Sequence, residues 1–506
     1  MQDRSVEISG KLAASLIIFF VVLKLIIHLP FNGSYGYHAD ELLYIAMAQQ
    51  LDWGYKEGPP LISFLTRVSL QFGGESLWML RLLPTLCSAL LVGITGMMAR
   101  MLGGGSFAIV IACTSILLDP SFLATGYMMQ PVVFDQLSWA LSCFFLLRFL
   151  KKGNRVDLLY LGITAGFGMM NKFSIALYLA SLFTFLPANS GRKLSFSELL
   201  YILLPGILIV FPHFIWQMNH GFPFVSQVRE LNAYYWSKTA YQTLVKQSLF
   251  SHGISGIVIC TGLSYLLFSV RMRSYRFIGI GFLLLQFVFL SLQAKTYYSY
   301  GALPVLYGAG AIFIAQLLTT WKRPVVNASF FAMIIISAAL AMPAVVPVLP
   351  LRDAVTWLDL MKKHTGITGP LQWDDGTTRR IPQYFAQMLG WKELAEETLS
   401  VYRSLPERKR SSTLIVTDNY QQAGAISFYG KDEVPATVSL RPSFFSRGDE
   451  GGKLQYTILV TSGTWPEDGA GTRVLSRQRV VFPEAEINGS MIYLIRHAGP
   501  IAYHAP

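Results

Sequence analysis

The chain has 506 residues, of which 53% are hydrophobic and 14% are charged, and its mean hydropathy is +0.44. Soluble domains usually contain about 25% charged residues, so this composition excludes a soluble protein and predicts a polytopic membrane protein. The formal net charge of +12 comes largely from basic residues in short loops between apolar runs. That distribution is typical of membrane orientation, so we expect no nucleic-acid partner.

The first apolar run covers residues 11–30, and ten more runs follow it. The first run is long for a signal peptide and lacks an obvious small-residue cleavage site, so we interpret it as a retained anchor. A helix needs about 20 apolar residues to cross the bilayer. The expected spans are 11–30, 77–99, 105–122, 128–149, 157–171, 173–188, 197–217, 252–270, 277–293, 302–320 and 325–348.

Lys172 separates the two shortest of these runs, 157–171 and 173–188. One long helix is the alternative, but it would put the basic loops at 151–155 and 192–193 on opposite sides of the membrane. Two spans keep the basic loops on one side, which the positive-inside rule makes cytoplasmic. The N-terminus is then cytoplasmic, and the C-terminal tail is periplasmic or extracellular.

From about residue 349 charged residues become frequent, and no run is long enough to span. Residues 414–416 and 456–460 are typical of buried strands, and 354–363 and 391–405 of amphipathic helices. The expected fold is an α-helical polytopic membrane protein with about eleven transmembrane helices and a C-terminal mixed α/β domain. We place a transmembrane domain at 1–348, with its first outer loop at 31–76, and an α/β domain at 349–506.

Unusual polar residues gather at the expected outer ends of the spans. Carboxylates near hydrocarbon are costly, so those at a membrane boundary are functional candidates. A carboxylate can deprotonate a hydroxyl nucleophile and lysines can hold a phosphate leaving group, so this set suits a reaction on a phosphate-bearing lipid. The residues are Asp40, Glu41, Asp119, Asp135, Lys172, His213, Trp216, Gln217, His220, Lys295, Tyr297, Tyr298 and Tyr300.

The acidic residues of this set also have structural interpretations. Asp40 or Glu41 can cap an interfacial helix, because an apolar-periodic stretch runs on to Leu51. Asp135 can be a structural group within its span, although an acid inside an apolar run is expensive.

The basic and aromatic residues have structural interpretations as well. Lys172 and Lys295 can extend to the lipid headgroups. Arg81 can anchor the outer end of the second span, and the aromatic residues around Tyr297 can belong to an interfacial belt.

Short sequence patterns recur along the chain in a fixed order and at the same expected face. Together they resemble the GT-C glycosyltransferases, in the bacterial branch that includes dolichyl-phosphate-mannose–protein mannosyltransferases and the lipid A aminoarabinose transferase. The resemblance covers nearly the whole chain. The patterns are Asp40-Glu41, Gly54-Tyr55-Lys56-Glu57-Gly58-Pro59-Pro60-Leu61, Arg81-Leu82, Asp135, Gly166 to Lys172-Phe173, Pro212 with Trp216-Gln217, His220-Gly221-Phe222-Pro223, Lys295 with Tyr297-Tyr298 and Pro304, Pro382-Gln383-Tyr384 to Gly390-Trp391, and Asn419-Tyr420 with Ala423-Gly424-Ala425.

The resemblance implies a polyprenyl-phosphate sugar as donor, and a bacterial inner membrane location with a periplasmic C-terminal domain. It implies that Asp40 is the base that deprotonates the acceptor, with inversion at the anomeric carbon, and that Lys172 meets the donor phosphate. The expected catalytic residues are Asp40, Glu41 and Asp135. The expected phosphate-binding residues are Lys172, Arg81 and Lys295, and the expected substrate-positioning residues are His38, Tyr55, Glu57, Tyr297 and Tyr298.

One position departs from the pattern. The aminoarabinose branch has lysine immediately before the Pro-Pro pair, where this chain has Gly58, and Lys56 is close but not equivalent. The sugar is therefore open, and a lipid, a glycan or a protein can be the acceptor. Acidic oxygens can hold a hard cation, but this branch implies no metal, and we expect no cofactor.

Two further functions remain as alternatives to a glycosyltransferase. A glycolipid transporter or flippase would use membrane carboxylates and lysines as its substrate path, but it should also show polar residues near the midplane of several spans. A membrane anchor with a catalytic tail is the third, and the tail shows no nucleophile–base pair that we recognise. Membrane lipids are expected partners in every case.

Overall fold

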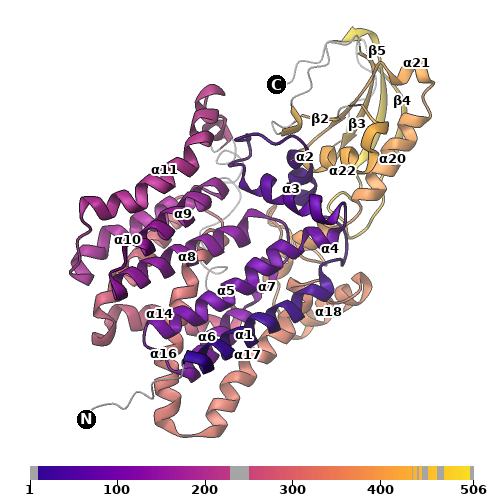
Figure 1. Ribbon diagram of the computed structural model, residues 1–506. Coiled ribbons are helices and arrows are strands. Elements are labelled where there is room, and N and C mark those ends of the chain that lie inside the picture. The colour runs from indigo at the N-terminus through magenta and orange to yellow at the C-terminus, as the bar shows by residue number, and fades with distance from the viewer. Residues whose placement is uncertain are drawn as a thin grey trace. The chain divides into compact units, whose positions relative to one another are not determined.

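The computed structural model describes residues 10–227, 229, 250–435, 437–440, 444–446, 454–463 and 472–501. Its contacts divide the chain into two compact units, whose elements Figure 1 labels. The helical unit contains the residues up to Asn32, Gly58–Leu61 and Trp78–Pro350. The mixed unit contains Gly33–Glu57, Ile62–Leu77 and the chain from Leu351 onward.

The helical unit has a helix at each of the eleven apolar runs. Among the residues that the structure describes, seven helices are long and apolar enough to cross a membrane: Gly10–Phe31, Leu77–Met101, Pro131–Lys152, Phe196–Asn219, Val270–Ser291, Thr296–Trp321 and Pro324–Val345. The count of eleven crossings stays a prediction. The elements are α1 (Gly10–His28), η1 (Leu29–Phe31), α4 (Leu77–Leu80), α5 (Leu82–Met101), α6 (Ser106–Leu117), α7 (Pro120–Ala124), α8 (Pro131–Lys152), α9 (Arg155–Asn171), α10 (Ser174–Ser190), α11 (Phe196–Asn219), η2 (Gly253–Ser255), α14 (Gly256–Phe268), η3 (Val270–Tyr275), α15 (Arg276–Ser291), η4 (Thr296–Ala302), α16 (Leu303–Trp321) and α17 (Pro324–Val345).

Local sequence signals explain where these helices begin and end. Pro131 opens α8, and Gly153 closes it in the left-handed conformation (φ 71°) that glycine adopts without strain. The chain then restarts at once, because the side chain of Asn154 accepts the N–H of Val156 at 3.0 Å and caps α9. The helix ends at Lys172, so the prediction of two helices rather than one across 157–188 is confirmed.

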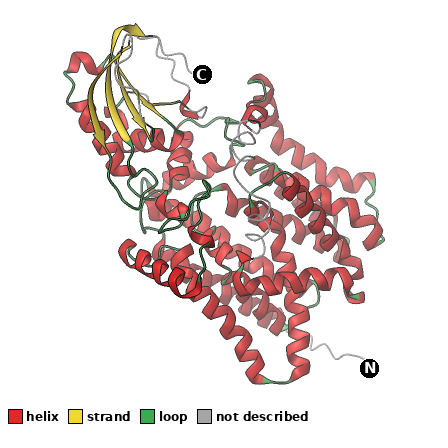
Figure 2. Cartoon of the chain, turned by 180° about the vertical axis from the view of Figure 1, so that it is seen from behind, coloured by secondary structure: helices red, strands yellow, loops and turns green. Residues whose placement is uncertain are grey.

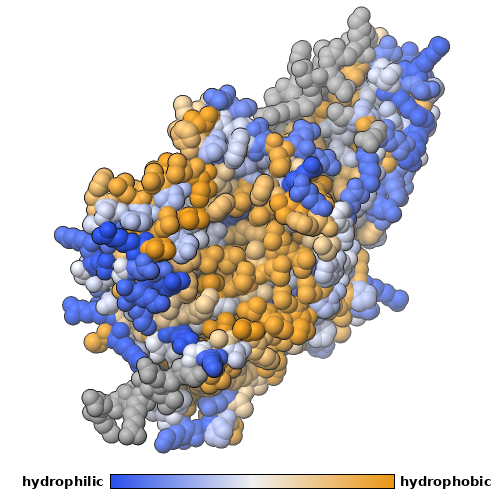
Figure 3. Space-filling model, viewed as in Figure 1, coloured by the Kyte–Doolittle hydropathy of each residue, from blue (hydrophilic) through white to orange (hydrophobic). Residues whose placement is uncertain are grey.

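The helices differ in how much of their surface the protein covers. In the most apolar stretch of α16 and the turn before it, 83% of the residues are buried inside the protein. In the corresponding stretches of α11 and α17, only 17% are buried. The side chains of Leu208 and Ile336 are 64% and 58% exposed. Figure 3 shows the resulting hydrophobic surface over the helical unit. Exposed apolar area on this scale is suited to lipid, which agrees with a multi-pass membrane protein.

The basic loops lie together at one end of the helical unit. The guanidinium of Arg100 lies beside Gly10 at the start of α1, and that of Arg271 lies beside Gly103. The ammonium of Lys151 donates to the carbonyl of Met101 at 3.1 Å. Because successive helices run in opposite directions, the predicted polar residues of this unit fall at its other end, whereas Asp40 and Glu41 belong to the mixed unit.

The mixed unit is built on a five-stranded sheet, drawn in yellow in Figure 2. Its strand order is β2-β1-β3-β5-β4, with β1 parallel to β2 and β3, and β5 antiparallel to β3 and β4. All five residues of β1 are buried, whereas the edge strand β4 is largely exposed and carries three arginines. Charge on an edge strand opposes pairing with another chain. The strands are β1 (Thr413–Thr417), β2 (Thr437–Ser439), β3 (Leu454–Thr461), β4 (Thr472–Arg479) and β5 (Met491–Ile501).

Helices complete the mixed unit. The predicted strands at 414–416 and 456–460 and the predicted helices at 354–363 and 391–405 are confirmed. The first loop belongs to this unit as well, because α2 packs against α22. The helices are α2 (Ala39–Gln49), α3 (Leu61–Gly73, grouped here from Ile62), α18 (Leu351–Thr365), α19 (Gln383–Ala386), α20 (Trp391–Arg403), α21 (Glu407–Arg410) and α22 (Tyr420–Gly430), with η5 (Gly369–Leu371), η6 (Lys431–Glu433) and η7 (Phe444–Ser446).

The crossing of α14 and α16 yields a stability prediction. A Cβ at Gly310 would overlap the carbonyl oxygen of Val258, so Gly310→Ala must push the two helices apart. Overpacking of this kind costs roughly 1–3 kcal/mol, and we expect a lower thermal unfolding midpoint for the detergent-purified protein.

The matched control is Gly206→Ala in α11, where the new Cβ would lie an ordinary 3.4 Å from the carbonyl oxygen of Gly162. We expect its midpoint to match that of the native chain. Equal midpoints for both variants would contradict the close crossing of α14 and α16.

Candidate functional site

Lys172 stands at the break between α9 and α10, next to two tyrosines. Its backbone is extended (φ −160°, ψ 131°), which turns the chain out of the helix. The ammonium lies 3.4 Å from the ring centre of Tyr298 and 4.9 Å from that of Tyr297. An aromatic face attracts a cation through its electrostatic quadrupole, so the two rings hold the ammonium in place. The structure thus brings together three of the predicted site residues.

Asp135 lies one turn into α8, and its side chain is almost completely buried. One carboxylate oxygen accepts the indole N–H of Trp139 at 3.0 Å, and the other accepts the hydroxyl of Ser174 at 3.4 Å. The positive charge of Lys172 also acts on this carboxylate. A buried carboxylate needs such partners, because desolvation without them is very costly.

Trp139 is itself held by its surroundings. Its ring stacks on Tyr178, with centroids 4.6 Å apart and planes 8° from parallel. Gly301 packs so closely that a Cβ there would lie 2.7 Å from the Cβ of Trp139. The indole that orients Asp135 therefore has little freedom to move.

These groups make one arrangement at the polar end of the helical unit. Lys172 is partly exposed, whereas Asp135 beneath it is buried. A fixed ammonium with access to the surface can bind an anion such as a phosphate ester and offset charge that develops on it.

A row of stacked rings continues from this point along α11. Phe173 lies with its ring centre 5.6 Å from that of His213, which stacks at 6.3 Å on Trp216. Trp216 stacks in turn on His220 at 4.2 Å. These three residues of α11 share one helix face, so the polar set predicted at the end of the seventh span lies beside the residue that follows Lys172.

Arg81 and Lys295 were both predicted to bind phosphate. Arg81 is fully buried, donates to the carbonyl of Asn32 at 3.2 Å and lies 5.5 Å from the ring centre of Tyr127. These contacts favour the structural interpretation, in which Arg81 anchors the start of α5.

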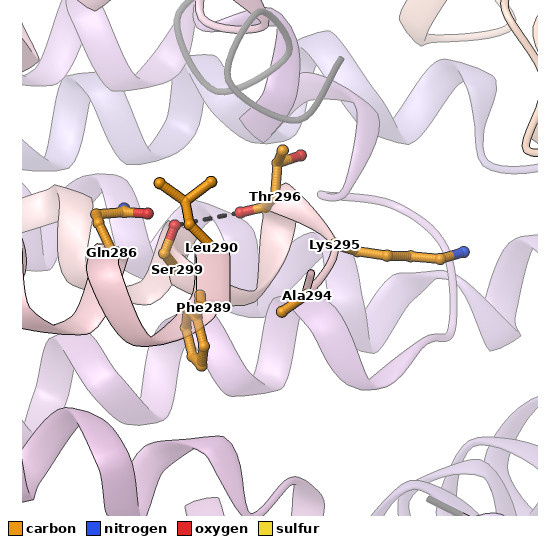
Figure 4. Close-up of a pocket in the computed structure, with 7 residues that line it drawn as sticks. All are labelled: Gln286, Phe289, Leu290, Ala294, Lys295, Thr296 and Ser299. Atoms are coloured by element: carbon orange, nitrogen blue, oxygen red, sulfur yellow. Dashed lines mark hydrogen bonds between the residues drawn. The ribbon is translucent and has the colours of Figure 1, made fainter. Parts of the chain in front are cut away.

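Lys295 lines a small open pocket formed mainly by α15 and η4. Figure 4 shows its side chain extending away from the other lining residues, while Ser299 donates to the carbonyl of Thr296 at 3.2 Å. Neither Asp135 nor Lys172 lines this pocket, so we do not take it as the reaction site. The lining residues are Gln286, Phe289, Leu290, Ala294, Lys295, Thr296 and Ser299.

In the mixed unit, His38 and Glu41 form a capping box at the start of α2. The ring nitrogen Nδ1 of His38 accepts the N–H of Asp40 at 3.1 Å, and the carboxylate of Glu41 accepts the N–H of His38 at 2.8 Å. Both side chains are buried. Reciprocal bonds of this kind satisfy the open N–H groups of a helix start. They favour the structural interpretation of Glu41 and show that His38 caps α2, while its predicted role in positioning a substrate stays a prediction.

Asp40 differs from its neighbour because its side chain is 29% exposed. The hydroxyl of Tyr420 donates to one of its oxygens at 2.8 Å, and the other oxygen lies 3.9 Å from Nδ1 of His38. A carboxylate at the start of a helix is stabilised by the helix dipole. Asp40 is thus an oriented, accessible carboxylate, as a general base must be.

Tyr55 and Glu57, predicted to position substrate, make protein contacts. The hydroxyl of Tyr55 contacts the carbonyls of Met47 (3.1 Å) and Gln50 (3.0 Å), and burial raises the pKa of this phenol. Glu57 accepts the N–H of Phe444. Both residues fold the first loop back on itself and onto the mixed unit.

The sequence analysis singled out Asp119 but missed its buried partners around α7, His252 and Tyr307, and the nearby Lys24. The ammonium of Lys24 donates to the carbonyl of Phe122 at 3.1 Å, and Asp119 contacts Nδ1 of His252 at 2.7 Å and the hydroxyl of Tyr307. Lys24 and Asp119 are at most 1% exposed. A lysine in the middle of an apolar run was the signal that was available, since such a residue needs an internal partner.

The comparisons with known proteins concern one stretch of the sequence and the fold. Residues 57–216 match the family described as dolichyl-phosphate-mannose-protein mannosyltransferase. The structure resembles the crystal structure of ArnT from Cupriavidus metallidurans bound to undecaprenyl phosphate, with a TM-score of 0.61 at 14% identity over 95% of this chain and 98% of that one. The same ArnT in its apo state gives a TM-score of 0.61 at 13% identity, again over 95% and 98%. No curated protein matches at the level of sequence.

The structural likeness shows that the chain has an ArnT-like fold of the GT-C type. The expected fold class, a polytopic helical protein with a C-terminal α/β region, is confirmed. The family match spans the stretch from Glu57 to Trp216, which contains Arg81, Asp135 and Lys172.

Gly58 marks a departure within this GT-C protein. Its φ is +152°, a conformation that residues with a side chain rarely adopt. A residue with a side chain at this position would therefore strain the backbone of the loop before Pro59-Pro60.

The capping box provides a test of Glu41. Glu41→Ala leaves the buried N–H of His38 without its acceptor and should cost roughly 1–3 kcal/mol, whereas Glu41→Gln keeps an acceptor oxygen and should cost little. Thermal unfolding of the purified variants measures the difference. An equal fall of the unfolding midpoint in both variants would show that stability depends on the negative charge of Glu41 and not on its oxygen as a hydrogen-bond acceptor.

Proposed function

We propose that this chain is a polyprenyl-phosphate-sugar-dependent glycosyltransferase, either a hexosyl- or a pentosyltransferase. It transfers the sugar to a hydroxyl or an amine of a lipid, a glycan or a protein. The reaction takes place at the periplasmic face of a bacterial inner membrane, with the N-terminus in the cytoplasm and the C-terminal domain in the periplasm. Basic loops grouped at one end of the helical unit support this orientation.

The observation that carries the proposal is the fixed ammonium of Lys172 beside the buried carboxylate of Asp135. It lies at the polar end of a lipid-exposed unit, where a lipid-linked phosphate would approach. The fold likeness to ArnT, whose structure contains undecaprenyl phosphate, supports the same class of donor. A donor carried on a lipid suits an external site, because cytosolic nucleotide sugars do not reach it.

In the proposed reaction, the acceptor oxygen or nitrogen attacks the anomeric carbon while Asp40 takes its proton. The bond from the anomeric carbon to the phosphate oxygen breaks, and its electron pair stays on the phosphate. Lys172 offsets the charge that develops on that leaving group. A single displacement inverts the anomeric centre. Asp135 keeps Lys172 oriented, and no cofactor takes part in this scheme.

The first test is sugar transfer in vesicles that contain the native chain or Asp40→Asn. Labelled polyprenyl-phosphate sugars serve as donors. Removal of a general base should lower kcat by roughly 10²- to 10⁴-fold. Asp52→Asn is the control, since Asp52 lies in the same loop and caps only the N–H of Trp53 at 2.7 Å.

Each result of this test has a clear meaning. Full activity in Asp40→Asn would refute Asp40 as the base. If the native chain consumes no donor, the glycosyltransferase proposal fails. A flipping assay with the same labelled lipids would then test a glycolipid transporter.

A second prediction concerns Lys172. Lys172→Met keeps an unbranched, flexible side chain that is one atom shorter but removes its charge, so binding of undecaprenyl phosphate should weaken roughly ten-fold or more. Competition with a labelled polyprenyl phosphate measures the change. Lys193→Met, at an exposed position in a basic loop, should bind as the native chain does. Equal affinity in all three proteins would remove Lys172 from the phosphate site.

A further inference from the structure

The N-terminus of α2 is held by residues that follow it in the chain by several hundred positions. Within the mixed unit, α22 packs along α2. Gly424 faces α2, where a Cβ would make an ordinary van der Waals contact of 3.4 Å with the Cβ of Leu42. Behind it, Leu43, Met47 and Ala423 form part of one buried apolar cluster. The start of α22 is thereby placed beside Asp40.

Tyr420 is the first residue of α22, and its hydroxyl donates to Oδ1 of Asp40 at 2.8 Å. The helix start that carries it is fixed, because Asn419 accepts the N–H groups of Gln421 (3.1 Å) and Gln422 (3.0 Å). A hydrogen bond to a carboxylate is stronger than one between neutral groups. This bond sets the direction in which the Asp40 carboxylate faces.

A second set of contacts fixes the backbone under Asp40. Nδ1 of His38 accepts the N–H of Asp40, so in the neutral ring the proton is assigned to Nε2, which donates to Oε1 of Gln387 at 3.1 Å. The backbone carbonyl of Gln387 accepts the N–H of Ala39 at 2.9 Å. The amide of Gln387 then donates to Glu486 at 3.3 Å. The start of α2 is thus bonded directly to Gln387, and through Gln387 it is linked to Glu486.

We propose that Tyr420 is a positioning residue for Asp40, and that the C-terminal part of the chain thereby helps to build the catalytic base. The inference rests on the proposed role of Asp40. A carboxylate joined to the backbone by two rotatable bonds reaches its partner oxygen in only part of its rotamers. Tyr420 selects one of them before the acceptor arrives, which lowers the cost of reaching the reactive geometry.

The proposed role of Tyr420 means that the mixed unit orients the catalytic base, which is a different role from selecting the acceptor. The base is supplied by the first loop, but its orientation depends on a hydroxyl 380 positions later in the chain. Truncation of the C-terminal part would then impair the chemical step itself, whichever acceptor is offered.

The test is Tyr420→Phe, which removes only the hydroxyl. With one donor and one acceptor, we expect kcat to fall roughly ten-fold, while KM for both substrates and the thermal unfolding midpoint stay as in the native chain. Tyr429→Phe is the matched control. Tyr429 lies on the same helix, and removal of its partly buried hydroxyl should leave all three quantities unchanged.

An unchanged kcat in Tyr420→Phe would overturn the inference. An equally large fall in kcat in Tyr429→Phe would also overturn it. So would a lower unfolding midpoint in Tyr420→Phe, because either result would indicate a merely structural role for the tyrosine. The amount of bound polyprenyl-phosphate donor measures how much of each protein is folded. The kcat of a poorly folding variant can then be calculated per folded molecule. Failure of the proposed function shows separately, as a native chain that transfers no sugar or an Asp40→Asn variant that transfers as well as the native.

Discussion

Every charged side chain inside the helical unit must find its partner within the protein, because lipid offers none. This requirement accounts for most of the polar contacts described above. Lys24 donates to a backbone carbonyl, Asp119 is bonded to His252, and Asp135 is bonded to Trp139. The contacts of Lys24 and Asp119 join segments far apart in the chain, whereas Trp139 lies in the same helix as Asp135, and it is Ser174 that joins Asp135 to α10. Lys172 meets the same requirement with aromatic faces, which leave its hydrogen-bond donors available to an anion.

The two units meet different demands with different structures. The helical unit packs through glycines and exposes leucine and isoleucine to lipid, whereas the mixed unit buries a conventional sheet core and carries charge on its edge strand. The first loop connects these two kinds of structure. Its helix α2 has the buried face of a soluble domain and carries, at its first turn, the carboxylate to which we assign the chemistry.

Much of the fold and part of the site followed from the sequence. The lengths of the apolar runs gave the helices, and Lys172 marked the break between α9 and α10 because a charge there ends an apolar segment. Asp135, Lys172 and Tyr298 were grouped correctly, since alternation of direction puts the ends of such helices on one face. The bond from Tyr420 to Asp40 was not predictable, because it depends on how α22 packs on α2. The capping role of His38 was missed because histidine is not among the favoured N-cap residues.

Gly58 has an evolutionary consequence. A lysine introduced at this position would carry the right charge but would have to adopt a backbone conformation suited to glycine. The first mutant on any such path would therefore be strained, and selection would tend to remove it before a change of substrate could be tested. A change of charge at this position therefore requires a change in the backbone of the loop as well.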